Sequence, residues 1–179
     1  MEITAAYRES RIKTYGFQKV MGLSLVEVTA LGRGMESLGR ALYRLGELGI
    51  EFHLVFSGVS DKGFPKGYLL MGREWEELLS GYMPPGGSVE PGVLLRIVSP
   101  VEMVYFHGPH FADRYGIVDA SVQALAVKGL HIMASACSGS CVYLVVPEGM
   151  ADKTAAALSE AFDVPKPARN VKRGNRVST

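Results

Sequence analysis

Histidine and cysteine are the residue types in this sequence best suited to acid–base, nucleophilic or metal chemistry. The four histidines are far apart along the chain, and none has the His-x-x-x-His or His-Glu-x-x-His spacing of a metal-binding helix. They are His53, His107, His110 and His131. The sequence therefore predicts no metal site built on a histidine pair.

Motifs that hold phosphate or activate a nucleophile are incomplete. Gly32 and Gly34 lack the rest of the dinucleotide-binding pattern, and the chain contains no Gly-Lys-Ser/Thr phosphate loop. The turn 138–140 (Ser-Gly-Ser) is followed by a predicted strand, whereas a nucleophile elbow requires a helix there. Because no catalytic triad or carboxylate pair can be assembled, the sequence predicts a protein that is not an enzyme and uses no cofactor.

The two cysteines, Cys137 and Cys141, flank a predicted three-residue turn. Residues that close a hairpin face each other, so the two sulfur atoms are expected to lie close together. His131 falls on the same strand face as Cys137, but a zinc site would need two ligands besides the cysteines. The other interpretation is a pair of buried, unreactive thiols.

A faint internal duplication organises the elements that must position any site. A shift of 80 positions superimposes the apolar pattern of residues 23–52 on that of residues 103–132. Within these segments Leu45 falls on Leu125 and Gly49 falls on Gly129. The matching pattern favours two copies of one structural unit.

The first copy is predicted to contain three strands and two helices. The strands span 23–30, 51–59 and 67–71, and the helices span 35–48 and about 75–82. Apolar residues at a spacing of three to four predict the two helices: Leu38, Leu42 and Leu45, with Ala41 beside them, and Trp75, Leu78, Leu79 and Tyr82.

The second copy repeats this order and is followed by a polar tail. Its predicted elements are strand 103–107, loop 108–116, helix 117–128, strands 131–137 and 141–146, and helix 151–162. The predicted inward side chains are Val118, Val122, Leu125, Ala155, Leu158 and Phe162. With one edge strand added, β-α-β-β-α becomes a ferredoxin-like layout, so we predict an α+β fold of two such units in tandem.

The segments outside the two copies suggest how the chain is divided. Residues 83–88 (Met-Pro-Pro-Gly-Gly-Ser) have the composition of a linker. The tail 165–179 contains five cations and no acid, and is expected either to be disordered or to add an edge strand through residues 169–171. We accordingly predict domains 1–90 and 91–164, followed by this basic tail.

Composition excludes several classes of partner. The 179 residues are 47% apolar and 21% charged, which is ordinary for a globular protein. A formal net charge of +1 gives no electrostatic footprint for nucleic acid. No apolar run approaches the ~18–20 residues of a membrane span, and the first ten residues lack the layout of a signal peptide. A cytoplasmic location is therefore expected.

Four stretches of the sequence resemble the regulatory region of aspartate kinases, which is a tandem pair of ACT domains. They are residues 25–52, 108–118, 133–146 and 151–162. The last stretch, ending in Leu-Ser-Glu-Ala-Phe, is the most specific match. The sequence departs from the family at 33–36, where Arg-Gly-Met-Glu replaces Asp-x-Pro-Gly, and at Tyr115-Gly116, which replaces Pro-Gly. No kinase domain is found in the chain, so it resembles a free-standing regulatory subunit or sensor.

The resemblance implies a small ligand, most often an amino acid, bound where a loop leads into a helix at an interface between domains. Backbone N–H groups at a helix start suit the ligand carboxylate, and Asp113 is expected to accept from its ammonium group. The residues expected to bind are His110, Asp113, Arg114, Tyr115, Gly116 and Ile117 in the second unit, and Arg33, Gly34, Met35, Glu36 and Ser37 in the first.

The resemblance also implies an assembly. Exposed sheet edges are liabilities unless they are covered, and we expect a homodimer with two-fold symmetry that covers them. The alternative function is that of an interaction subunit that associates with an amino-acid biosynthetic enzyme and no longer binds an effector.

Overall fold

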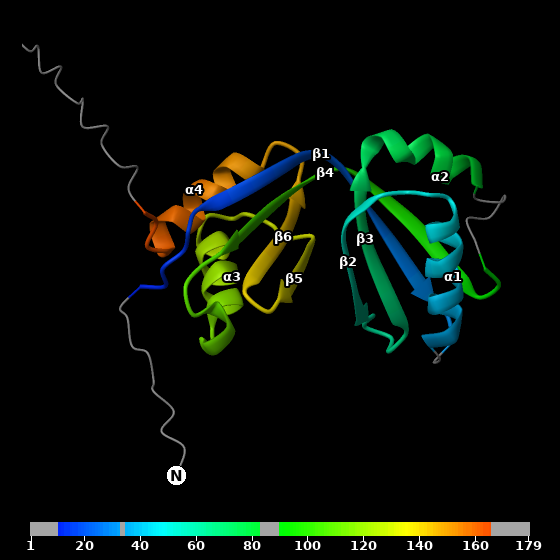
Figure 1. Cartoon of the computed structure of the whole chain (residues 1–179), viewed down its shortest axis with the longest axis horizontal. Coiled ribbons are helices and arrows are strands. Elements are labelled where there is room, and N and C mark those ends of the chain that lie inside the picture. Colours follow the sequence, from blue (N-terminus) through cyan, green and yellow to red (C-terminus); the bar gives the residue numbers. More distant parts are fainter. Residues whose placement is uncertain (1–10, 33–34, 83–89, 166–179) are drawn as a thin grey trace, which may run out of the picture.

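The structure, a computed structural model, describes residues 11–32, 35–82 and 90–165 of the chain (Figure 1). Within these ranges six strands form one antiparallel sheet in the order β2-β3-β1-β4-β6-β5. The strands are β1 (Phe17–Ala30), β2 (Phe52–Val59), β3 (Pro65–Gly72), β4 (Val93–His107), β5 (Ala134–Ser138) and β6 (Cys141–Pro147). The helices are α1 (Met35–Glu47), α2 (Glu76–Tyr82), α3 (Ile117–Val127) and α4 (Ala151–Ala161), with short 3-10 turns η1 (Arg73–Trp75) and η2 (Phe111–Asp113).

Strands β1 and β4 are long and belong to both halves of the sheet. Their ladder runs from the Phe17–Phe106 pair to the Ala30–Val93 pair. The register shifts near its middle, beside Gly22, whose φ of 68° is a left-handed conformation that favours glycine. Both strands arch across the molecule at this point (Figure 1).

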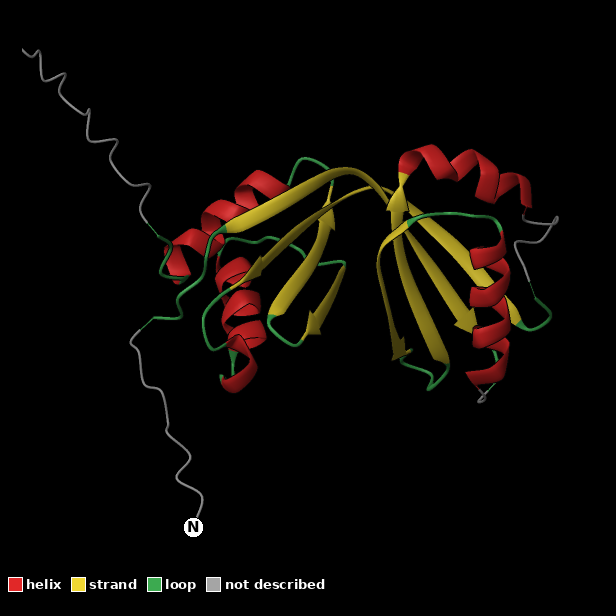
Figure 2. Cartoon of the chain, in the orientation of Figure 1, coloured by secondary structure: helices red, strands yellow, loops and turns green. Residues whose placement is uncertain are grey.

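Each half has the ferredoxin-like arrangement. The first half contains β2, β3, the second part of β1 and the first part of β4. The second half contains β5, β6, the second part of β4 and the first part of β1. In Figure 2, α1 and α2 cover one face of the first half, and α3 and α4 cover one face of the second. The expected α+β class with two ferredoxin-like units is confirmed.

The strand that completes the second half comes from the beginning of β1. Phe17–Val20 pairs with β4 in this half. The sequence assigned no strand to these residues, nor to the first part of β4. Residues 169–171, the predicted alternative, lie outside the described residues, as does the linker 83–88. The division of the chain near residue 90 stays a prediction, because both long strands run through both halves.

Three clusters of buried side chains hold the sheet and helices together. One lies under α1 and α2, one lies under α3 and α4, and the third lies on the opposite face, where the two halves meet. Each half contributes to the third cluster, which consists of Leu23, Leu25, Leu70, Val101, Met103 and Val145. No described helix is long and apolar enough to cross a membrane.

The helix faces agree with the predicted ones in part. Leu38, Ala41 and Leu45 are buried on α1, as expected. On α3 the predicted inward residue Val122 is wrong, because it is 43% exposed while Ser121 and Leu125 are buried. The helix turns Ile117, Ser121 and Leu125 toward the core, and this spacing of four leaves Val122 facing the β5 side.

Candidate functional site

The junction between β4 and α3 is a loop with two left-handed positions. His110 has φ of 61° and Gly116 has φ of 82°. The Asp113 amide donates a hydrogen bond of 3.1 Å to the His110 carbonyl, which closes the η2 turn. A Cβ on Gly108 would lie 2.2 Å from the Lys13 carbonyl oxygen, so the loop entry requires glycine.

The start of α3 carries no side-chain cap. Gly116 is the N-cap residue, and its carbonyl accepts the first helical bond from the Ala120 amide at 2.9 Å. The only acid in the first turn, Asp119, accepts from Gln123 at 2.9 Å. The uncapped N–H groups and the positive end of the helix dipole are suited to an anionic group.

The predicted residues of this junction differ in accessibility. His110 and Asp113 are exposed, and Tyr115 is 97% exposed. Arg114 is half-buried, and Ile117 is buried in the second core. The side chains of His110, Asp113 and Tyr115 are therefore accessible to a ligand, whereas Ile117 offers only its backbone amide.

The junction between β1 and α1 is held by ion pairs. Glu36 forms an ion pair with Arg40, which also donates to buried Glu90 at 2.8 Å. Arg44 reaches the other oxygen of Glu90 at 3.1 Å. Hydrogen bonding to Glu90 and the charge of Glu36 raise the pKa of Arg40. Arg40 and Arg44 thus tie α1 to the entry of β4 through Glu90, and the exposed Glu36 carboxylate pairs with Arg40 at the solvent side of this network.

The remaining predicted residues of the first junction are accessible or lie outside the described chain. Met35 is 56% exposed, and Ser37 is half-buried beside the Arg40 guanidinium, with 3.4 Å between the nearest polar atoms. Arg33 and Gly34 lie outside the described residues. Because β1 and β4 are antiparallel, the two junctions lie at opposite ends of their ladder, and one chain does not bring them together.

The cysteines do not face one another. Cys141 pairs with Ser138 and Cys137 pairs with Val142, so two residues form the turn and the cysteines lie on opposite sheet faces. The prediction of neighbouring sulfur atoms was wrong because the turn is one residue shorter than expected. Hydrogen bonding to Cys141 raises the pKa of Tyr143 on the same face. Among the described residues no group of three potential metal ligands occurs.

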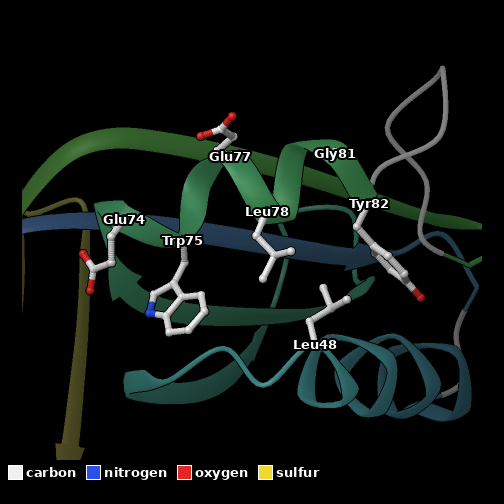
Figure 3. Close-up of a pocket in the computed structure, with 7 residues that line it drawn as sticks. All are labelled: Leu48, Glu74, Trp75, Glu77, Leu78, Gly81 and Tyr82. Atoms are coloured by element: carbon white, nitrogen blue, oxygen red, sulfur yellow. The ribbon is translucent and has the colours of Figure 1, made fainter.

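A groove between α1 and α2 was not predicted from the sequence. It has a volume of about 740 Å³ and is lined by Leu48, Glu74, Trp75, Glu77, Leu78, Gly81 and Tyr82 (Figure 3). Leu78 and Tyr82, which belong to the apolar spacing that predicted the helix, are 44% and 40% exposed. Leu79 is the residue that α2 buries.

Comparison with known proteins identifies the fold. No known protein family matches the sequence, and no curated protein resembles it significantly. The regulatory subunit of aspartate kinase from Thermus flavus has a similar structure, with a TM-score of 0.71 and 18% identity over 84% of this chain and 99% of that one.

Two aspartate kinases contain a similar fold as one part of their longer chains. Aspartate kinase from Synechocystis has a TM-score of 0.71 and 18% identity over 91% of this chain and 29% of its own. Aspartokinase III from E. coli, in complex with lysine and aspartate, has a TM-score of 0.58 and 12% identity over 88% and 35%. The chain therefore has the tandem ACT fold of the regulatory part of aspartate kinase, and the expected resemblance is confirmed.

Proposed function

We propose that this chain, whose fold is that of an aspartate kinase regulatory subunit, is a non-catalytic regulatory protein that binds an amino acid. The observation that carries the proposal is the extent of the likeness. The described fold matches 99% of a free-standing regulatory subunit, and the matched enzymes contain it as about a third of their length. The proposal places the protein in the cytoplasm.

The β4–α3 junction is the better of the two candidate ligand sites. The ammonium group of an amino acid would bind exposed Asp113, and its carboxylate would bind the uncapped start of α3. His110, Arg114 and Tyr115 would surround the ligand, and left-handed Gly116 leaves the helix start open. In the first unit, by contrast, the Glu36 carboxylate already binds Arg40.

A second copy of the chain would complete this site. Edge strand β5 and helix α3 border an open groove of about 390 Å³ that includes Val122 and Met133, which are 43% and 37% exposed. A homodimer that pairs sheet edges would bury these side chains and bring a neighbouring strand toward the junction. Light scattering at tens of micromolar protein is expected to give the mass of a dimer, and a strictly monomeric mass would refute this assembly.

Thermal melting with single amino acids tests the proposal. The panel is lysine, threonine, methionine, arginine and the aromatic amino acids. A ligand present at a hundred times its Kd stabilises the folded state by about 2.7 kcal/mol, which raises Tm by several degrees. We expect one member of the panel to produce this shift and the others to leave Tm unchanged.

The alternative is an interaction subunit that has lost its effector. The ion-paired Glu36 and the absence of the family's aspartate at the first junction favour it. It predicts no Tm shift with any amino acid, together with co-purification of a larger enzyme from the native host. A Tm shift with a single amino acid would eliminate this alternative.

A further inference from the structure

The two pairs of helices are packed differently. Helices α3 and α4 contact each other, and the groove that remains between them is smaller, about 390 Å³, and is lined mainly by small residues such as Ala120, Ala124 and Ala157. The Lys128–Glu160 ion pair of 2.7 Å bridges this groove. Helices α1 and α2 stand apart, and the groove lies between them (Figure 3). Large side chains of α2 and η1 project into this space, and no element in the described part of the chain covers them.

The groove has apolar walls and acidic flanks. Trp75, Leu78 and Tyr82 project toward Leu48 at the end of α1 (Figure 3). Both charged groups in the lining, Glu74 and Glu77, are exposed carboxylates, and none of its described members is basic. A half-exposed apolar surface with acids around it is suited to a segment that carries an apolar side chain between cations.

We propose that the C-terminal tail of a second copy of this chain, residues 166–179, occupies this groove. The tail contains five cations and no acid, so the other 165 residues carry a formal net charge of −4. The N-terminal ten residues, the other end of the chain outside the structure, contain two acids and one cation and lack this complementarity.

The tail contains the pattern that the groove requires. Val171 is flanked by Arg169 on one side and by Lys172 and Arg173 on the other. Val171 would fill the apolar space, the cations would pair with the two glutamates, and a guanidinium over the Trp75 ring would add a cation–π contact. Since the contact depends on pairs of opposite charges at an exposed surface, the affinity is expected to fall with added salt.

The place where the described chain ends indicates that a tail in the groove comes from another copy. The described chain ends at Pro165, after α4, whereas the groove lies at the opposite end of the long axis of the molecule (Figure 1). Fourteen fully extended residues reach at most about 50 Å, and a tail that crossed its own chain would spend part of this reach before it arrived at the groove. Exchange of tails within a dimer avoids this limit.

Trp75 provides a specific signal because it is the only tryptophan in the chain. In the full-length chain with Lys172→Glu and Arg173→Glu, we expect Trp75 emission to shift to longer wavelength and to be more easily quenched by acrylamide than in the wild type. Addition of a synthetic peptide of residues 165–179 should reverse both changes. Raising the salt from 50 to 500 mM should weaken this peptide's apparent affinity about tenfold.

Charge reversal in the groove provides the matched test. With Glu74→Lys and Glu77→Lys added to the tail variant, the peptide should no longer change Trp75 emission. Glu148→Lys, an exposed acid of the second half, should leave the peptide response intact. A peptide carrying Val171→Asp should bind at least about tenfold more weakly, because the apolar contact is lost.

Several outcomes would overturn the proposal. These are wild-type emission from the tail variant, equal binding of the Val171→Asp peptide, or a peptide response that survives charge reversal in the groove. If Trp75 of the tail variant shifts to shorter wavelength as protein concentration rises, the folded surface of a second copy covers the groove instead of the tail. None of these readouts depends on amino-acid binding.

Discussion

The two halves of the molecule share one arrangement of elements but leave different parts of it open. In the second half the helices are packed together, while the junction before α3 is exposed and uncapped. In the first half the junction residue Glu36 is tied to Arg40, while the helices stand apart around the groove. A duplicated unit has thus kept its sheet and changed which surface is available for binding.

The difference has a local cause in each half. Small residues line the narrower space between α3 and α4, whereas the large side chains of Trp75, Leu78 and Tyr82 line the wider space between α1 and α2. The first junction begins a helix with arginine side chains at successive turns that reach buried Glu90. The second junction begins with a glycine that has no side chain to offer. Our two proposals accordingly place ligand binding in the second half and a polypeptide contact in the first.

The largest expected effect tests whether the two halves unfold as one unit or independently. Phe106 is fully buried and packs edge-on against Phe111 and Phe162, with ring centroids 5.8 Å and 5.2 Å apart. Phe106→Ala should cost about 4 kcal/mol of unfolding free energy, because a large cavity forms in the second core. Since β1 and β4 link both halves, Trp75 fluorescence in the first half should report the same lowered urea midpoint as circular dichroism. A Trp75 transition that stays at the wild-type midpoint would show that the halves unfold independently.

The next effect concerns the two junctions as ligand sites. Asp113→Ala should weaken binding of the stabilising amino acid by tens-fold or more, since an ammonium group loses its charged partner. Glu36→Ala should change that affinity by less than about twofold, because Arg40 already occupies this carboxylate. Titration calorimetry on both variants measures the two affinities, and unchanged melting temperatures would show that the fold is intact. If both variants bind like the wild type, neither junction is the site.

A smaller loss of stability is expected when buried Glu90 is replaced. It should exceed the loss from the matched change in the second half. Glu90→Gln should lower the unfolding free energy by about 1–2 kcal/mol, because two arginines lose a buried partner but remain half-exposed. The matched change in the second half is Lys128→Ala, which breaks a solvent-exposed pair and should cost less than about 0.5 kcal/mol. Urea denaturation measures both losses of unfolding free energy. Equal losses would contradict the role of Glu90 in tying α1 to the entry of β4.

The sequence predicted the elements that carry a local pattern. The helices at 35–48, 117–128 and 151–162 were found to within one residue, because each repeats apolar residues with the helical period and is bounded by turn residues. The strand residues before Gly22 and before Pro100 were missed, because these two residues interrupt the β pattern and because the β1–β4 ladder depends on pairing between distant segments.

The exposure and contacts of the candidate-site side chains were harder to predict than the elements. Helical spacing indicates that α2 has an apolar face, but it cannot show that α1 stands too far away to cover Leu78 and Tyr82. The loop before α3 was identified correctly as a loop, but the exposure of its acid follows from tertiary structure. The ion pair that engages Glu36 is different, because its spacing of four residues from Arg40 was visible in the sequence.

The smallest expected effect is a pH dependence of stability that arises at Glu76. This residue anchors α2 to β1 and β4 at the point where both strands pass from one half to the other. Ser24 and Ser99 both donate to its carboxylate, and these bonds lower the pKa of Glu76 from its ordinary value of 4.5. A lowered folded-state pKa means that the ionised form stabilises the fold above about pH 4.5 and that this contribution is lost as the pH falls through the folded-state pKa.

The wild type should therefore exceed Glu76→Gln in stability at pH 6 to 7, by less than about 1 kcal/mol because the site is partly solvated. The difference should shrink as the pH is lowered below 4.5, as measured by urea denaturation at a series of pH values. Glu148→Gln, at an exposed site in the second half, should show no such trend. If the Glu76 difference is the same at pH 3 and pH 7, the two serines do not stabilise the ionised carboxylate, and α2 is held above the groove by its buried Leu79 alone.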